Sequence, residues 1–492
     1  MTSQIDYSKK WFTLIATGMG IFLCTVDGSI VNVALPTLVP ALKTDFSVIQ
    51  WVVLGYLLTV STLMLSIGRL GDMIGKKPLY TAGFVIFTAG SVLCGSASSV
   101  YFLIVFRIIQ ALGSALIMAL GMAIVTEAFP PSERGKALGI SGTIVSVGIA
   151  IGPSLGGIIM TFLSWRWIFL VNLPIGIVGT YAVIKFVQPG NVEGKQKFDF
   201  MGSLLMFFSI LSLLLGLTIG QQKGFNQPLI FILFGICLLT LVLFAIAESR
   251  IKQPMINLLF FKNSLFSINL TNGFIAFIGV SGTIILLPFY LQNILQYQTI
   301  IVGLLLCVVP VALGISSPIA GILSDRFGTR LISTLGLVVV FIGFYMASSL
   351  NENTTAIGYI IRLLPLGIGM GIFQSPNNSA IMGSVPKEHL GISSGLVSLS
   401  RTLGQTVGVA VLGTLWASRT FYHAGVNQSG GATTAPAAAQ VAALQDTFLV
   451  VVGFISVTWR PTAFLSLIEK KSSLALARKR IIPSVSINIR LS

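Results

Sequence analysis

Charged residues are scarce in this sequence, and acidic residues are the scarcest. Only 9% of the 492 residues are charged, Asp and Glu number 14 against 30 Lys and Arg, and 54% of the residues are hydrophobic. The mean hydropathy is +0.93. Such a chain is too apolar to fold as a soluble globular protein. The composition predicts a polytopic membrane protein.

Histidine and cysteine are also rare, which argues against several kinds of site. The two histidines, His389 and His423, lie in connections, and no metal-ligand or nucleophile spacing occurs. The four cysteines lie in apolar segments without paired spacing: Cys24, Cys94, Cys237 and Cys307. No Gly-x-x-x-x-Gly-Lys-Ser/Thr sequence is present, which argues against ATP-driven transport by this chain alone. We expect no enzymatic activity, no cofactor and no metal.

The net charge of +16 comes from basic residues scattered over short connections. This distribution argues against a nucleic-acid partner, because such a partner would call for a basic soluble domain. With the N-terminus in the cytoplasm, only four basic residues fall outside: Lys43, Arg166, Lys223 and Arg419. The asymmetry predicts a multi-pass protein of the inner (plasma) membrane with both termini cytoplasmic. No small-residue cleavage signal follows the first apolar segment, so we expect that segment to stay as an anchor.

Fourteen apolar segments are long enough to span a bilayer, which takes roughly 20 residues in a helix. They cover approximately 11–35, 48–67, 79–98, 101–126, 137–162, 166–187, 200–220, 228–247, 265–291, 300–323, 331–350, 356–382, 391–417 and 446–468. The last is irregular, because Trp459, Arg460 and Pro461 place a charge and a helix breaker inside it.

An internal repeat divides the chain. The stretch Gly68–Lys77 returns as Gly321–Arg330, and the pair Arg107 and Gly113 returns as Arg362 and Gly369. Near-equal offsets after helices of the same number predict two parallel six-helix halves. Two spans without a counterpart form an insertion. The predicted domains are a bundle at 1–190, the inserted pair and linker at 191–262, a second bundle at 263–468 and a basic cytoplasmic tail at 469–492.

Asp27 lies in the middle of the first span, deeper than any other acid in the sequence. A carboxylate there costs roughly 2.5 to 3.5 kcal/mol on insertion scales, and such residues usually mark an ion or substrate pathway. The alternative is a structural acid that Thr25, Ser29 or Asn32 caps. Arg107 is a second buried charge, which favours the ionised acid, whereas burial favours the neutral one. If helix motion shifts that balance, Asp27 binds and releases a proton on opposite sides of the membrane.

Five motifs in order resemble the major facilitator superfamily, specifically its fourteen-helix drug:proton antiporters of the EmrB/QacA type. They are Asp27–Pro36, Gly68–Lys77, Arg107–Gly113, Gly148–Gly157 and Trp165–Gly176. The resemblance reaches to about Trp416. It implies an all-α integral membrane protein with the major facilitator fold, and export in exchange for protons.

The loop after the second span is similar to the superfamily's cytoplasmic gate. There Asp72 can accept hydrogen bonds from helix N-termini and from Arg134, in a clasp that holds one conformation. The alternative for the basic residues is a purely topological role. The predicted gate comprises Gly68, Arg69, Asp72, Gly75, Lys76, Arg134, Asp325 and Arg326.

The fifth span carries the antiporter motif. Gly148, Gly152 and Gly156 recur at every fourth residue, so they form a face on which another helix can approach closely. Pro153 bends the helix, and Gly157 completes the motif. Such a contact can seal one side of a cavity. Ordinary small-residue packing is the alternative.

Substrate contacts are predicted from polar and amphipathic residues near spans of both halves. They are Asn32, Gln50, Trp51, Tyr56, Gln292, Gln374, Asn377 and Asn378. With one deep acid, we expect monovalent cationic, neutral or zwitterionic amphiphiles. Arg362 and Arg401 are expected to bind backbone carbonyls rather than substrate.

The leading hypothesis is a proton-coupled exporter of amphiphilic drugs, dyes or toxic compounds. A second is a dedicated exporter of an endogenous lipid, siderophore or secondary metabolite, and a third is a membrane sensor that has lost transport. We expect a monomer in the lipid bilayer. A periplasmic adaptor protein is kept as an alternative further partner.

Overall fold

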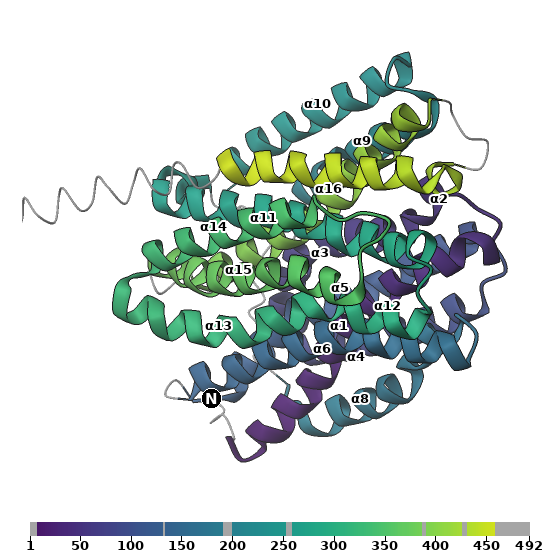
Figure 1. Cartoon of the computed structure of the whole chain (residues 1–492). Helices are drawn as coiled ribbons and strands as arrows, with labels where there is room; N and C mark the ends of the chain where they lie inside the picture. Colours follow the sequence, from purple (N-terminus) through teal and green to yellow (C-terminus); the bar gives the residue numbers. More distant parts are fainter. Residues whose placement is uncertain are drawn as a thin grey trace, which may run out of the picture.

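The computed structural model describes residues 7–130, 133–189, 199–251, 258–385, 390–425 and 431–457. These residues form helices and connections, with no strand among them, and fourteen helices are long and apolar enough to cross a membrane. The predicted all-α fold class is confirmed. Figure 1 shows the long helices packed side by side.

The first half of the molecule contains the helices between Tyr7 and Phe186. They are η1 (Tyr7–Lys9), α1 (Lys10–Ala41), α2 (Phe46–Ile49), α3 (Trp51–Ile74), α4 (Lys76–Ser96), α5 (Val100–Ala128), α6 (Arg134–Phe162), α7 (Trp167–Leu170) and α8 (Asn172–Phe186). The inserted pair is α9 (Phe200–Lys223) and α10 (Pro228–Arg250). Below, the bundle end at which α1 begins is the Lys10 end, and the opposite one is the Ala41 end.

The second half repeats this pattern. Its helices are η2 (Leu258–Lys262), α11 (Ser264–Phe289), η3 (Tyr290–Ile294), α12 (Thr299–Leu306), α13 (Val308–Phe327), α14 (Thr329–Ala347), α15 (Ala356–Gly383), α16 (Leu390–Ala424), η5 (Ala432–Thr434) and a final helix, Ala437–Val457. Both halves turn on a glycine between their second and third spans: Gly75 has φ 102° and Gly328 has φ 90°. Glycine suits such a φ because it has no Cβ.

Glycines also let helices approach closely at matching places in the halves. A Cβ on Gly113 of α5 would collide with the backbone of Phe87 in α4, and one on Gly369 of α15 with the backbone of Val340 in α14. Small residues are the usual means of close helix packing in membranes. The repeated sequence motifs therefore coincide with repeated packing.

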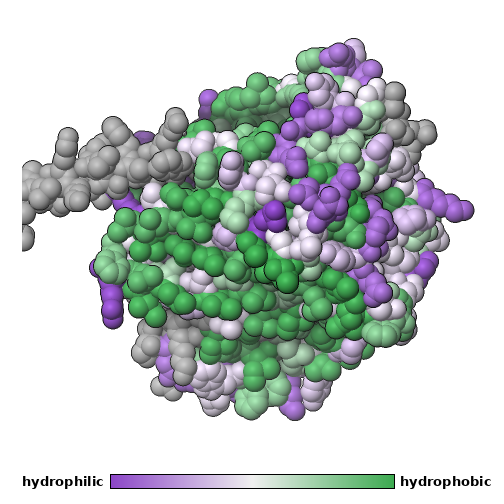
Figure 2. All heavy atoms as spheres, viewed as in Figure 1, coloured by the Kyte–Doolittle hydropathy of each residue, from purple (hydrophilic) through white to green (hydrophobic). Residues whose placement is uncertain are grey.

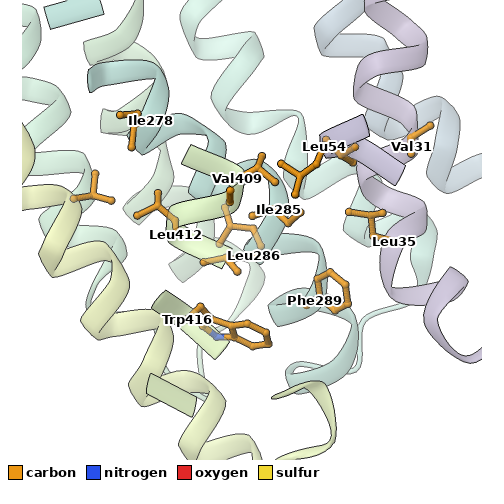
Figure 3. Close-up of a cluster of buried hydrophobic side chains, with 14 of the residues drawn as sticks. Val31, Leu35, Leu54, Ile278, Ile285, Leu286, Phe289, Val409, Leu412 and Trp416 are labelled. Carbon is orange, nitrogen blue, oxygen red and sulfur yellow. The ribbon is translucent and has the colours of Figure 1, made fainter. Parts of the chain in front are cut away.

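The two halves meet in an apolar cluster toward the Ala41 end. Figure 3 shows Val31, Leu35 and Leu54 of the first half facing side chains of the second half. Close by, the Phe46 ring lies 5.1 Å from that of Phe289 and 4.9 Å from that of Trp416. These contacts close the space between the halves at this end.

The inserted helices flank both halves. Helix α9 packs against α3 and α16, and a hydrogen bond joins Ser203 of α9 to Ser66 of α3. Helix α10 packs mainly on α9 and leaves most of its apolar side chains exposed, as α13 does. Figure 2 shows a broad hydrophobic area around α13 on the face in view. Such surfaces suit contact with lipid tails.

The last span differs from its predicted position of 446–468. The helix runs from Ala437 to Val457, so it begins nine residues earlier. Its first turns are rich in alanine, which favours helix strongly but contributes less hydropathy than leucine or valine. Asp446 therefore lies within a helix and not in a connection. The interruption at 459–461 and the tail at 469–492 lie outside the described residues.

Candidate functional site

An ion pair between Asp27 and Arg107 lies inside the first half. Arg107 Nη1 of α5 donates to Asp27 Oδ2 of α1 over 2.6 Å, and Arg107 is 1% and Asp27 0% exposed. Removing both charges from water is costly, so such a pair needs further hydrogen bonds to persist. The surrounding residues provide them.

Three neutral side chains complete the site. Gln110 Nε2 and Asn172 Nδ2 donate to Asp27 Oδ1 over 2.8 and 2.9 Å, and Gln110 Oε1 accepts from Arg107 Nη1 over 2.7 Å. Ser91 Oγ accepts from both amides. The site thus draws on α1, α4, α5 and α8. Gln110, Asn172 and Ser91 are not among the predicted site residues, although Gln110 lies one turn after Arg107 and Asn172 lies in the sixth-span motif.

The alternative in which Thr25, Ser29 or Asn32 caps Asp27 is wrong. The Thr25 and Ser29 hydroxyls donate to carbonyls of α1, and Asn32 Nδ2 donates to the Gly28 carbonyl. These side chains complete the hydrogen bonding of their own helix, a common local arrangement for such residues. The acid is held by other helices.

Tyr56 stands between the ion pair and the central cavity. Its ring lies 4.2 Å from Arg107 Cζ, within range of a cation–π interaction. Its hydroxyl donates to Ser114 Oγ over 2.6 Å, and both residues line the cavity. Asp27 itself is not among the lining residues. Tyr56 therefore touches the ion pair on one side and the cavity on the other.

The cavity lies between the halves and measures about 300 Å³. Three of the predicted contacts line it, namely Asn32, Tyr56 and Gln374. Asn377 and Asn378 line an adjoining recess together with Gln374 and Arg401. Helices of both halves thus contribute polar groups to one space.

Three predicted cavity residues lie elsewhere. Gln292 Nε2 donates to Thr37 Oγ1 over 3.1 Å, which ties the halves together at the Ala41 end. Gln50 is fully buried and its Nε2 donates to the Ser47 carbonyl, while Trp51 packs on the apolar cluster between the halves. Polarity alone predicted their place in the cavity, but the contact between the halves covers them.

The glycines of α6 make close contacts on two sides. A Cβ on Gly148 or Gly152 would collide with the Thr25 or Ser29 hydroxyl of α1, and one on Gly156 would lie 2.8 Å from Ile30. Gly157 and Pro153 instead approach α12 of the second half, where a Gly157 Cβ would lie 2.7 Å from the Thr299 carbonyl oxygen. This motif joins the helix that carries Asp27 to the closure at the Ala41 end.

The predicted gate lies at the Lys10 end. Lys76 forms an ion pair with Glu127 of α5 over 2.5 Å. Gly68 lies on α3, Gly75 makes the turn to α4, and Arg326 is exposed on the last turn of α13. The side chains of the other gate residues lie outside the described part of the structure: Arg69, Asp72, Arg134 and Asp325.

Two arginines of the second half behave differently from each other. Arg362 donates to the Gly358 carbonyl over 3.0 Å and to Ser349 Oγ over 2.9 Å, as a backbone-binding residue would. Arg401 lines the cavity and has no hydrogen-bond or ion-pair partner among the described residues. The prediction that Arg401 binds backbone carbonyls is therefore wrong, because its side chain faces the cavity instead.

Comparison with known proteins extends this picture. A family model described as the Major Facilitator Superfamily matches residues 17–409. The chain is 37% identical to the riboflavin transporter RibZ of Clostridioides difficile, over 84% of this chain and 90% of that one. It is 32% identical to the multidrug transporter protein MdtP of Bacillus subtilis, over 85% and 77%. The multidrug resistance protein Stp of Mycobacterium tuberculosis is also 32% identical, over 82% and 76%.

Solved structures share the fold at low sequence identity. The nucleoside transporter NupG aligns with a TM-score of 0.63 at 12% identity, covering 92% of this chain and 99% of that one. A bacterial homolog of the human lysosomal transporter Spinster, in an inward-facing conformation, aligns with a TM-score of 0.63 at 15% identity, covering 93% and 97%.

Proposed function

The chain belongs to the major facilitator superfamily, and on this premise we propose that it is a proton-coupled antiporter that exports amphiphilic small molecules. That it is a multi-pass membrane transporter follows from the family and the fourteen helices. The observation that supports proton coupling is the buried pair of Asp27 and Arg107, in which Arg107 contacts the cavity-lining residue Tyr56. The multidrug relatives support export of drug-like molecules.

The hydrogen bonds of Asp27 suggest how a proton is taken up. In the present state Oδ2 accepts from Arg107, and Oδ1 accepts from Gln110 and Asn172. A protonated carboxyl loses its charge, so Arg107 then keeps only neutral partners such as the Val52 carbonyl, 3.2 Å from its Nε. Proton binding therefore loosens the contact between α1 and α5.

Tyr56 links this event to the substrate. A molecule in the cavity contacts Tyr56 directly, and Tyr56 stacks on Arg107. Displacement of the ring alters the position of the guanidinium and so changes the proton affinity of Asp27. Substrate and proton thereby compete through two residues, which is sufficient for exchange transport.

A second candidate is a dedicated exporter of one endogenous compound. The riboflavin transporter among the relatives supports this alternative, since it is named for a single metabolite. The ion pair and the coupling mechanism are the same in both cases. The candidates differ only in the range of molecules that the cavity accepts.

The membrane placement and the assembly state are proposals as well. We place the protein in the plasma membrane with the Lys10 end facing the cytoplasm, acting as a monomer. This orientation follows the distribution of basic residues.

The test is proton-driven transport by the purified protein in liposomes, measured with a fluorescent amphiphile. We expect Asp27→Asn to abolish transport driven by a proton gradient while leaving substrate exchange intact. Asp45→Asn is the matched control, because Asp45 caps α2 at the Ala41 end and asparagine caps a helix equally well. Proton-driven transport that survives in Asp27→Asn contradicts the proposed coupling.

A further inference from the structure

The cavity carries an unbalanced positive charge. Among the described residues that line it, Arg401 is the only charged one. Asp27, the single deep acid, is enclosed by Arg107, Gln110 and Asn172. The carboxylate is thus unavailable to a bound molecule, whereas the guanidinium of Arg401 is directly available.

Arg401 differs from the other arginines whose contacts the structure records. Arg107 binds Asp27, Arg166 binds the Ala97 carbonyl, and Arg419 binds Asp446. A charged group at membrane depth is expensive unless it has a partner or faces water, and such residues usually serve a function. A cavity-facing arginine with no protein partner in the described chain is suited to bind a ligand.

Two acceptors of the cavity and its adjoining recess also lack partners in the described chain. The Oδ1 atoms of Asn32 and Asn377 are buried without a hydrogen bond, and these residues line the cavity and the adjoining recess. A buried acceptor left unpaired costs stability, so these atoms call for donors from a bound molecule. Ligand N–H or O–H groups would satisfy them.

The remaining walls are amphipathic. Gln374 and Gln405 add amide groups, while Tyr56, Phe277 and Tyr359 supply aromatic surface. Flat apolar bodies pack well against such rings. The lining therefore matches an apolar or aromatic molecule with a polar, negatively charged part.

We propose that Arg401 is the anion-binding residue of the substrate site, and that this transporter carries amphiphiles bearing one oxyanion group, such as a carboxylate or a phosphate ester. The guanidinium binds the oxyanion through two parallel hydrogen bonds, and Asn32 and Asn377 accept from the ligand's donors. This inference rests on the proposed function and specifies its substrate class. It replaces the expectation of monovalent cationic, neutral or zwitterionic amphiphiles, which treated Asp27 as the charge that a substrate meets.

The experiment uses two dyes that share one ring frame and differ in charge. Fluorescein carries a carboxylate, and a mildly acidic buffer keeps its phenol protonated so that it bears one oxyanion; rhodamine 123, whose carboxyl group is esterified, is a cation. Binding of each to the purified full-length protein in detergent is measured by fluorescence polarisation. We expect the unmodified protein to prefer fluorescein, and Arg401→Gln to weaken fluorescein binding about tenfold or more while leaving rhodamine 123 binding unchanged or tighter.

Two further variants separate charge from structure. Arg401→Lys keeps the charge but loses the two-pronged geometry, so we expect an intermediate loss of fluorescein affinity. Arg362→Gln is the matched control, because Arg362 binds only Ser349 and its own helix among the described residues, and we expect fluorescein binding to be unchanged.

Several results would overturn the inference. A preference of the unmodified protein for rhodamine 123 would do so, and this comparison requires no variant to fold. Fluorescein affinity within twofold of the parent in a folded Arg401→Gln would do so as well. Transport in liposomes distinguishes the two proposals. If a proton gradient drives transport of rhodamine 123 but not of fluorescein, the proposed exporter function is supported and the anion site is refuted. If fluorescein binding depends on Arg401 but a proton gradient drives no transport, the anion site is supported and the proposed exporter function is refuted.

Discussion

The two halves of the molecule share a scaffold but divide the charges between them. Arg107 of α5 and Arg362 of α15 occupy equivalent places in the repeat, each ahead of a glycine that packs against the preceding span. Arg107 is buried and binds Asp27. Arg362 instead binds the hydroxyl of Ser349, which precedes α15, and a backbone carbonyl of its own helix. The charge of the second half that faces the cavity is instead Arg401, on the next span.

This difference teaches that packing and chemistry are specified separately. The close contacts at Gly113 and Gly369 are alike because any helix pair with this crossing needs them. The charged residues are not alike, because Arg107 binds a buried acid and Arg362 binds neutral groups. In our proposal the first half handles the proton, and the second half binds the anionic group of the substrate.

The largest effect is expected when the ion pair of the first half is broken. Arg107→Met leaves Asp27 charged and buried without its cation, which costs about 3 to 5 kcal/mol. The equivalent change, Arg362→Met, removes partly exposed hydrogen bonds and should cost about 1 kcal/mol. Thermal unfolding of both variants in detergent measures the contrast. Equal losses in the two would contradict the division of charges between the halves.

A double variant sharpens that prediction. Removing both charges, in Asp27→Asn with Arg107→Met, leaves no unpaired ion, so much of the lost stability should return. The same thermal measurement applies. The expectation would be contradicted if the double variant were less stable than Arg107→Met alone. The stability lost in Arg107→Met would then not come from leaving the Asp27 charge unpaired.

The glycine contacts should respond alike in both halves. Gly113→Val and Gly369→Val each insert side-chain atoms against backbone, at an expected cost of roughly 1 to 3 kcal/mol or more. Gly235→Ala of α10 is the control, because a Cβ there has open space, and it should be neutral or stabilising by up to about 1 kcal/mol. Unfolding temperatures of the three variants test whether the scaffold is truly shared.

Changes at Tyr56 should disturb coupling more than stability. Tyr56→Phe removes a hydroxyl that bonds Ser114, worth about 0.5 to 1.5 kcal/mol, but keeps the ring over Arg107. Tyr56→Leu also removes the cation–π contact, so substrate should no longer alter proton binding. The number of protons moved per substrate, measured in liposomes, should fall in Tyr56→Leu only. Tyr359→Leu, in the second half of the cavity, is the control for lost substrate contact.

The smallest effect is expected at an ion pair near the Ala41 end. Asp446 of the final helix accepts from Arg419 Nη2 over 2.6 Å, and His423 Nε2 lies 2.8 Å from the same oxygen. The three side chains are partly exposed, so Asp446→Asn should cost only about 1 kcal/mol. A loss as large as that of Arg107→Met would mean that burial does not decide the importance of these charges.

Much of this protein follows from the sequence alone. Hydropathy sets the fourteen spans, because a helix of about 20 mainly apolar residues is more stable in the hydrocarbon of a bilayer than in water. The predicted span 446–468 begins too late, because the first turns of the helix consist largely of alanine and not of larger apolar residues. Asp27 stands out for the same physical reason, since a carboxylate in hydrocarbon is expensive and therefore rarely accidental.

The surroundings of each residue depend on tertiary structure. Gln110 and Asn172 reach Asp27 from helices 83 and 145 residues away, and no local pattern predicts that meeting. Likewise, polarity does not tell whether a side chain faces the cavity, like Gln374, or the contact between the halves, like Gln292.

The sequence by itself determined the number of spans, the repeat and the presence of one deep acid. Only the tertiary structure decided which charged side chain faces the cavity. Hydropathy and spacing describe how far along a helix a residue lies, whereas the packing of neighbouring helices sets the direction in which it points. Packing encloses Asp27 behind Tyr56 and leaves Arg401 facing the cavity.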